Sequence, residues 1–251
     1  MMRLFEVRLF LPEGERTVSS FGSLLHGALM ERLPGDLAKR LHEQDMRPYS
    51  QSVSWDKKGG FASWRIGVVE EEMGEAVEAV LRETEGIFLR QKGGEARLGE
   101  RRLLMERSFE EIADAFFLTE APPKGAELSF CTPTSFKREG RYVMLPEFFL
   151  ICQSLLMRWN RFAGEVQLYE ADLTQRLASA CRLLQYALHS APFSVEGHTI
   201  YGFRGNLRVR FFGTDGARRI LGMLFAFAPF VGVGIKTALG MGAVKTKVWE
   251  G

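Results

Sequence analysis

Four histidines, at positions 26, 42, 189 and 198, are the side chains in this sequence best suited to proton transfer. The pKa of imidazole lies near neutrality, so a histidine can serve as a general base or a general acid. His42 lies at the end of a short predicted helix, where the helix dipole favours the protonated ring. The spacing alone fits an exposed histidine without a chemical role as well, and it suggests no partner for His189 or His198.

A second chemical candidate is a glycine-rich stretch near the C-terminus, which runs from Gly232 to Gly242 and contains Lys236 and Thr237. Glycine allows unusual backbone angles and close backbone approach, and exposed amides beside a lysine can bind phosphate. A P-loop would need the order strand, glycines, helix, whereas the expected order is helix, glycines, strand. A tight helix-to-strand connection therefore remains open as an alternative.

Metal and disulfide chemistry find little support in the sequence. No cluster of Asp, Glu and His predicts a metal site, and no cofactor is expected. The three cysteines, Cys131, Cys152 and Cys181, are widely spaced and form no CxxC pair. Reduced thiols in a cytoplasmic protein are the expected state.

Alternating and helical apolar spacings predict an order of elements in the first half of the chain that corresponds to β-α-β-β-α-β, the ferredoxin-like arrangement. The expected elements are a strand at 5–11, a helix from a Ser19 or Ser20 cap to Leu33, a short helix capped by Asp36 and ending near His42, a hairpin around the 57–60 turn, a helix at 73–81 and extended segments from 87.

The second half repeats this order less regularly, after a boundary marked by Pro122, Pro123 and Gly125. We expect an α+β protein with domains at 1–121 and 122–251. The expected elements are a strand at 128–131, a helix from Pro146 through Trp159, a helix at 172–183, strands at 194–199 and 203–212, a helix around 220–225 and a last strand with Val244 and Val248 inward.

The apolar helix followed by the glycine-rich stretch resembles the C-terminal signature of the RAMP superfamily of CRISPR proteins, which are RNA-binding proteins with ferredoxin-like folds. Further stretches resemble the Cas-six family of precursor CRISPR RNA endoribonucleases within it. These are Gly22 to Leu29, Leu41 to Glu43 with Arg47 to Ser50, and Thr132 to Phe136 with Gly140 to Tyr142 and Pro146. The resemblance implies two tandem ferredoxin-like domains of RAMP type with a C-terminal glycine-rich loop.

The resemblance also implies a metal-independent endoribonuclease that cuts CRISPR repeat transcripts. The 2′-hydroxyl of the substrate would attack the adjacent phosphorus and leave a 2′,3′-cyclic phosphate and a 5′-hydroxyl end. His42 stands where the family has its usual catalytic histidine. Met30 stands where some members have a tyrosine, so we expect His26 or Tyr49 to substitute, and Arg47 stands near the place of a lysine.

For RNA binding, the resemblance indicates Gly232, Gly234, Lys236, Thr237, Gly240 and Gly242 of the glycine-rich stretch. Arg204, Arg208 and Arg210 alternate along one strand and are expected to share one face, which could follow an RNA backbone or simply be solvated. The net charge is only +2. A nearly neutral protein can bind RNA only if its cations gather on one surface.

The expected partner is CRISPR repeat RNA, with other CRISPR effector subunits and a homodimer left open. The longest apolar stretch, 220–233, contains Gly222 and Pro229 and is too short to span a bilayer. We therefore expect a cytoplasmic prokaryotic protein without a membrane segment. A non-catalytic RNA-binding subunit of a CRISPR effector complex is the alternative function.

Overall fold

The structure is a computed structural model that describes residues 1–11, 21–89, 94–195 and 197–249. The first half contains β1 (Met2–Phe10), α1 (Phe21–Met30), α2 (Gly35–Glu43), β2 (Tyr49–Asp56), β3 (Phe61–Val68), α3 (Glu71–Glu83), β4 (Gly86–Leu89), β5 (Gly94–Arg107) and α4 (Phe109–Phe117). Its antiparallel sheet has the order β2-β3-β1-β5-β4. The ferredoxin-like order β2-β3-β1-β5 is present, and β4 extends the sheet at its edge.

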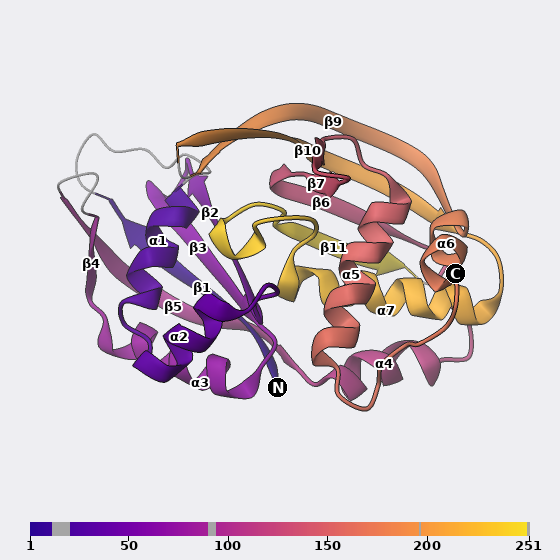
Figure 1. Cartoon of the computed structure of the whole chain (residues 1–251), viewed down its shortest axis with the longest axis horizontal. Coiled ribbons are helices and arrows are strands. Elements are labelled where there is room, and N and C mark those ends of the chain that lie inside the picture. The colour runs from indigo at the N-terminus through magenta and orange to yellow at the C-terminus, as the bar shows by residue number, and fades with distance from the viewer. Residues whose placement is uncertain (12–20, 90–93, 196, 250–251) are drawn as a thin grey trace.

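The second half contains β6 (Gly125–Thr134), β7 (Phe136–Arg138), β8 (Arg141–Val143), α5 (Phe148–Phe162), α6 (Leu173–Ser179), β9 (Cys181–Val195), β10 (His198–Phe211), α7 (Asp215–Val231), the 3-10 turn η1 (Thr237–Leu239) and β11 (Val244–Trp249). Its sheet has the order β11-β6-β10-β9. This is the ferredoxin-like order again, with the small β7–β8 hairpin added after β6. Figure 1 shows the two halves side by side.

The structure corrects several predicted boundaries. Asp36 lies in the first turn of α2 and Pro34 takes the cap position, while Ser19 and Ser20 lie outside the described residues. The predicted helix at 172–183 is wrong in its last part, because α6 ends at Ser179 and β9 begins at Cys181. The predicted strand at 194–199 is also wrong, because β9 ends at Val195 and β10 begins at His198, and β9 is much longer than expected.

In each half, the helices of that half cover one face of the sheet. In the first half, Phe5, Val7 and Leu9 point to the core beneath α1, α2 and α3. In the second half, Leu207 and Val209 of β10 point to the core beneath α5 and α7. The alternation of buried and exposed residues along these strands follows from this one-sided cover. The opposite face of the second sheet is left open, whereas the C-terminal end of α7 lies against part of the opposite face of the first sheet.

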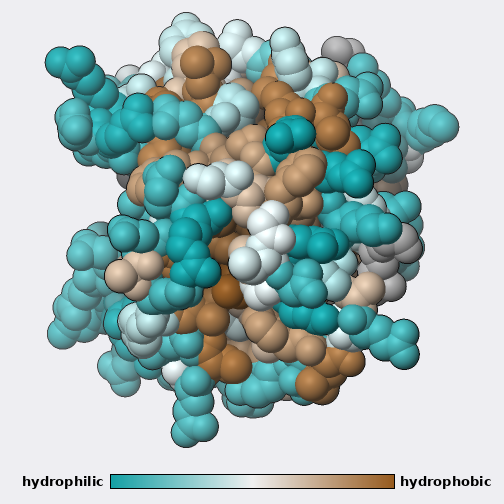
Figure 2. All heavy atoms as spheres, turned by 90° about the vertical axis from the view of Figure 1, so that its right-hand side faces the viewer, coloured by the Kyte–Doolittle hydropathy of each residue, from teal (hydrophilic) through white to brown (hydrophobic). Residues whose placement is uncertain are grey.

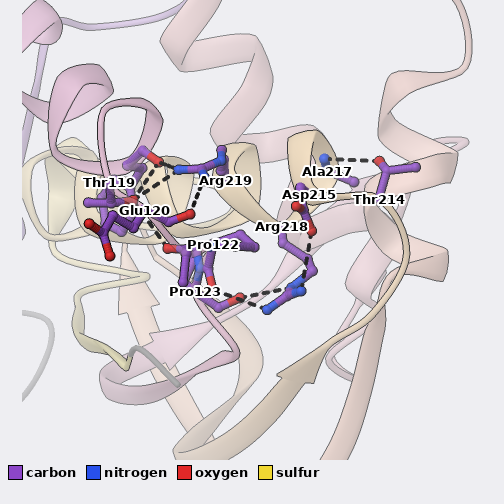
Figure 3. Close-up of polar contacts among 11 residues, drawn as sticks. Thr119, Glu120, Pro122, Pro123, Thr214, Asp215, Ala217, Arg218 and Arg219 are labelled. Atoms are coloured by element: carbon purple, nitrogen blue, oxygen red, sulfur yellow. Dashed lines mark hydrogen bonds and ion pairs between the residues drawn. The ribbon is translucent and has the colours of Figure 1, made fainter.

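The connection between the halves is fixed to α7 by two adjacent arginines (Figure 3). Arg218 donates from Nε and Nη2 to the carbonyls of Pro123 and Pro122, both at 3.1 Å. Arg219 donates to the carbonyl of Phe116 and to the Thr119 hydroxyl. Backbone acceptors on a connecting segment need donors when they leave solvent. The boundary at 121/122 itself remains a prediction.

The end of the molecule on the right of Figure 1 exposes apolar side chains between hydrophilic ones (Figure 2). Exposed apolar residues on the second half include Leu184, Tyr186 and Phe212. Scattered apolar surface of this kind is usual in folded proteins. It supports no conclusion about a partner.

The two halves meet where the C-terminal end of α7 and the η1 turn lie against α1, β2 and β3. The Ser50 hydroxyl donates to the carbonyl of Phe230 at 2.9 Å. A Cβ atom on Gly22 would lie 2.5 Å from the carbonyl oxygen of Leu239 and 2.9 Å from the Cα of Gly240. Helix α1 thus touches the backbone after η1 directly, and only glycine fits at position 22.

We predict that Gly22→Ala destabilises the protein by about 1–3 kcal/mol, because the new methyl group meets backbone atoms that cannot rotate away. Gly27→Ala, on the same helix, is the matched control: nothing lies within 4 Å of its added Cβ. Alanine there should stabilise the helix by up to ~1 kcal/mol. Urea denaturation of both variants measures the difference, and equal effects would contradict the close contact.

Candidate active site and RNA interface

His26 and Tyr49 contact each other directly. The Tyr49 hydroxyl and Nδ1 of His26 form a short hydrogen bond. The two rings lie nearly parallel, with centroids 6.0 Å apart and an angle of 17° between their planes. Helix α1 presents His26, and the first residue of β2 presents Tyr49. A phenol can donate or accept, so Tyr49 fixes the orientation of the imidazole without selecting one tautomer.

Tyr49 is an interior residue, only 1% exposed. Burial raises the pKa of its phenol, and the nearby charge of Arg47 opposes that shift in part. The phenol therefore stays protonated across the physiological range and is unsuited to act as an anionic base. Its contact with His26 instead indicates a positioning role.

Arg47 connects this pair to the segment that carries His42. The Arg47 Nε donates at 3.2 Å to the carbonyl of Leu41, the residue before His42. His42 itself is exposed, in the last turn of α2. His26 and Tyr49 thus contact each other, while Arg47 lies near enough to Tyr49 for its charge to act on the phenol and binds the backbone next to His42. The proton-transfer and bracing roles of these four residues remain predictions.

A pocket of about 220 Å³ lies beside this segment, between the two halves. Met46, four residues after His42, contributes one wall. Ser154 and Arg158 of α5 and Gly234 of the glycine-rich stretch contribute others. The predicted catalytic segment and the predicted RNA-binding stretch therefore share one pocket.

Within the glycine-rich stretch, Gly232, Gly234, Gly240 and Gly242 all have positive φ, from 69° to 112°. Most of the stretch is buried, and many of its amides donate to protein acceptors. The Gly234 amide donates to the Ser154 hydroxyl at 2.9 Å, and the Ile235 amide donates to the carbonyl of Ser135 at 3.0 Å. The sequence had suggested that these amides are exposed and can bind phosphate. That suggestion is wrong for these amides, because they donate to protein acceptors. RNA contact by the stretch remains a prediction.

Lys236 and Thr237 occupy different environments in this stretch. Lys236 is half-buried and adopts a left-handed conformation with φ of 52°, directly before η1. Thr237 is buried, and its side chain lies against the position where a Gly232 Cβ would stand. Thr237 thus packs inside the stretch, so of the two Lys236 is the better placed to reach RNA.

Gln51 is a central residue that the sequence analysis did not select. Its Nε2 donates to the carbonyls of Gly22 and Ala238, at 3.0 and 2.7 Å, and its Oε1 accepts from the Trp64 indole at 2.7 Å. Gln51 is only 2% exposed. A glutamine among inward-pointing apolar residues of β2 is the sequence signal that could have found it, because buried amides need partners.

The three arginines of β10 face the open side of the second sheet. Arg208 and Arg210 are exposed, and the buried residues Leu207 and Val209 between them face the helices. Lys245 and Lys247 of β11 are exposed as well, and register places Lys247 and Arg208 on either side of Glu127. Arg208 lies 3.6 Å from that carboxylate. The open face therefore gathers cations around one acidic residue.

A larger cleft, of about 620 Å³, lies between the first sheet, on the face away from its own helices, and the β11 edge of the second sheet. Arg204 and Lys245 line it from the second half, and Ser52 and Arg65 line it from the first. The Nε atom of Arg204 is buried and has no hydrogen-bond partner among the described residues. A buried donor of this kind needs an acceptor, which a water molecule or a bound ligand can supply.

The remaining candidates lie elsewhere or differ in character. His189 and His198 are exposed on β9 and β10. Met30 packs against the first core. In the described part of the chain, no group of three or more His, Cys, Asp or Glu side chains gathers as a metal site. None of the described helices is both long and apolar enough to cross a bilayer.

Comparison with known proteins connects this geometry to a family. The profile of the family described as CRISPR-associated endoribonuclease Cas6 matches residues 128–244. A Cas6 from Streptococcus thermophilus is 30% identical over 220 residues, covering 88% of each chain. A Cas6 from Mycobacterium tuberculosis is 29% identical over 233 residues, covering 92% of this chain and 73% of that protein.

Among solved structures, a Thermus thermophilus Cas6 product complex is 25% identical and superposes with a TM-score of 0.79, covering 98% of this chain and 100% of that chain. Together with the two sheet orders, this confirms the predicted tandem ferredoxin-like fold of RAMP type. Since the Streptococcus relative matches most of both chains at 30% identity, the chain belongs to the family of CRISPR-associated endoribonucleases Cas6.

Proposed function

We propose that this protein cuts CRISPR repeat transcripts without a metal ion, by attack of a substrate 2′-hydroxyl on the adjacent phosphorus. The bond from phosphorus to the 5′-oxygen breaks, which leaves a 2′,3′-cyclic phosphate and a 5′-hydroxyl end. The observation that carries the proposal is the direct His26–Tyr49 contact, together with Arg47, whose charge acts on Tyr49 and whose Nε binds the backbone beside His42. It supplies two histidines and one permanent cation in a single region.

His42 is proposed as the general acid that protonates the leaving 5′-oxygen. It is exposed in the last turn of α2, where a bound substrate can reach the ring. His26 is proposed as the second proton-transfer group, with its ring held by Tyr49. Arg47 keeps its charge and is suited to stabilise the phosphorane oxygens, which become more negative in the transition state.

The RNA is proposed to lie on the open, cationic face of the second sheet and to reach the cleft between the sheets. Arg208, Arg210 and Lys247 offer phosphate contacts on that face, and Arg204 offers one in the cleft. The Thermus thermophilus relative is described as a product complex. The nearly neutral net charge is compatible with RNA binding because alternation along the strands places these cations on one side.

A non-catalytic RNA-binding subunit is the second candidate. Met30 favours it, because methionine cannot exchange a proton where some family members carry a tyrosine. In that case the same surface would bind RNA without cutting it. The cleavage experiment therefore also separates these two functions.

We predict that the wild-type protein cuts labelled repeat RNA at one site in the presence of EDTA, and that His42→Ala cuts at least ~100-fold more slowly. Binding of the RNA should be retained, because His42 is a surface residue. Gel analysis of the products, with the cyclic phosphate identified by mass, measures both. Wild-type binding without cutting would exclude the nuclease, and full activity of His42→Ala would exclude only the assignment of His42.

The His26–Tyr49 pair leads to a separate prediction. His26→Ala should slow cleavage by about 100-fold or more if His26 transfers a proton. Tyr49→Phe keeps the ring and removes only the hydroxyl, so we expect a smaller loss, about tenfold, with a shifted pH–rate profile. The pH dependence of single-turnover rates measures this. An unchanged profile in Tyr49→Phe would contradict a positioning role.

A further inference from the structure

Arg158, on α5, is a cation that has no anionic partner among the described residues. In the same part of the chain its one hydrogen bond runs from Nη2 to the carbonyl of Gly234, at 2.7 Å. Its Nε atom is enclosed and unpartnered there, and no described carboxylate lies within ion-pair distance. By contrast, Arg3, which is also largely buried, contacts the carboxylates of Glu78 and Glu106.

Leaving a guanidinium in this state is unfavourable for folding. Desolvation lowers the pKa of Arg158 to about 10, so the group is still charged at neutral pH. An enclosed charge without a counter-ion costs stability that a neutral side chain of the same size would not. The cost is removed when an anion enters the site.

The pocket described above is where such an anion would enter. Arg158 lines it together with Lys137, Gln153 and Ser154, and none of the described lining residues is acidic. Met46 of the segment that follows His42 lines it as well. The volume, about 220 Å³, accommodates a phosphodiester group with part of its sugar.

We infer that Arg158 and the pocket between α5, the His42 segment and the glycine-rich stretch bind a backbone phosphate of the RNA. The inference rests on the proposed function for the identity of the anion. The guanidinium presents a planar set of donors that suits phosphate oxygens. The bound phosphate neutralises Arg158 and holds the strand at the pocket that Met46 of the His42 segment helps to form.

The competing explanation is structural: Arg158 would serve only to hold the carbonyl of Gly234. The two explanations differ in the effect of Arg158→Met, which retains much of the side-chain volume without charge. A structural arginine makes this variant less stable. A phosphate-binding arginine gives equal or higher stability, because an uncompensated charge is removed, together with weaker RNA binding.

The experiment measures the affinity of wild type, Arg158→Met and Arg158→Lys for 2′-O-methylated repeat RNA, which cannot react, over a series of salt concentrations. Arg161→Met, on the exposed side of the same helix, is the matched control. We expect Arg158→Met to weaken binding about tenfold and to lower the salt slope by ~0.7, the loss of one phosphate contact. Arg158→Lys keeps the positive charge and should therefore show the wild-type salt slope. Arg161→Met should show the wild-type affinity and salt slope.

A second measurement does not depend on cleavage or on RNA. Inorganic pyrophosphate should raise the melting temperature of the wild type and of Arg161→Met, but not that of Arg158→Met. If repeat RNA is not cut but this difference is found, the proposed function fails and the anion site stands. An equal salt slope and an equal pyrophosphate shift in Arg158→Met would overturn the inference. If Arg158→Met does not fold, Arg158→Gln, which removes the charge and keeps a polar side chain, replaces it, and an unchanged salt slope together with an unchanged pyrophosphate shift in that variant overturns the inference.

Discussion

The structure depends on one close approach: the backbone of the glycine-rich stretch lies directly against helix α1 and the end of β6. A Cβ atom on Gly22 would collide with the backbone of Leu239. A Cβ atom on Gly234 would collide with the carbonyl oxygen of Ser135. Backbones at this distance exclude water, so their polar groups must bind each other or a side chain. The amide of Gln51 completes this by bonding both Gly22 and Ala238.

The contact of the glycine-rich stretch with α1 and β6, here called the seam, also sets the geometry of the candidate site. Tyr49 precedes Gln51 by two residues on β2, so both point to the same interior face, and the first holds His26 while the second holds the backbone of α1. Any shift of the glycine-rich stretch would therefore move the His26 ring. The β9–β10 hairpin, which arches over the top of Figure 1, adds Phe193 and Ile200 to a small core with Leu239 and Met241.

Charge is arranged by the same alternation that builds the sheets. Helices cover one face of the second sheet, so side chains that alternate with the core lie on its open face, and on β10 and β11 these include three arginines and two lysines. A protein with a net charge of +2 thereby gains a cationic surface. Arg158 is the exception, because it lies on a helix and within the seam between the halves.

Sequence alone determined the family, the α+β class, the short helix that ends in His42 and the open-face arginines, because local periodicity and a glycine signature carry that information. It misplaced the start of β9, whose residues are exposed on both faces at the sheet edge and so show no alternation. The contacts of Gln51, the His26–Tyr49 pair and the isolated charge of Arg158 were decided only by tertiary structure. Each joins segments 23 to 187 residues apart, and local patterns do not encode which distant backbone meets a given side chain.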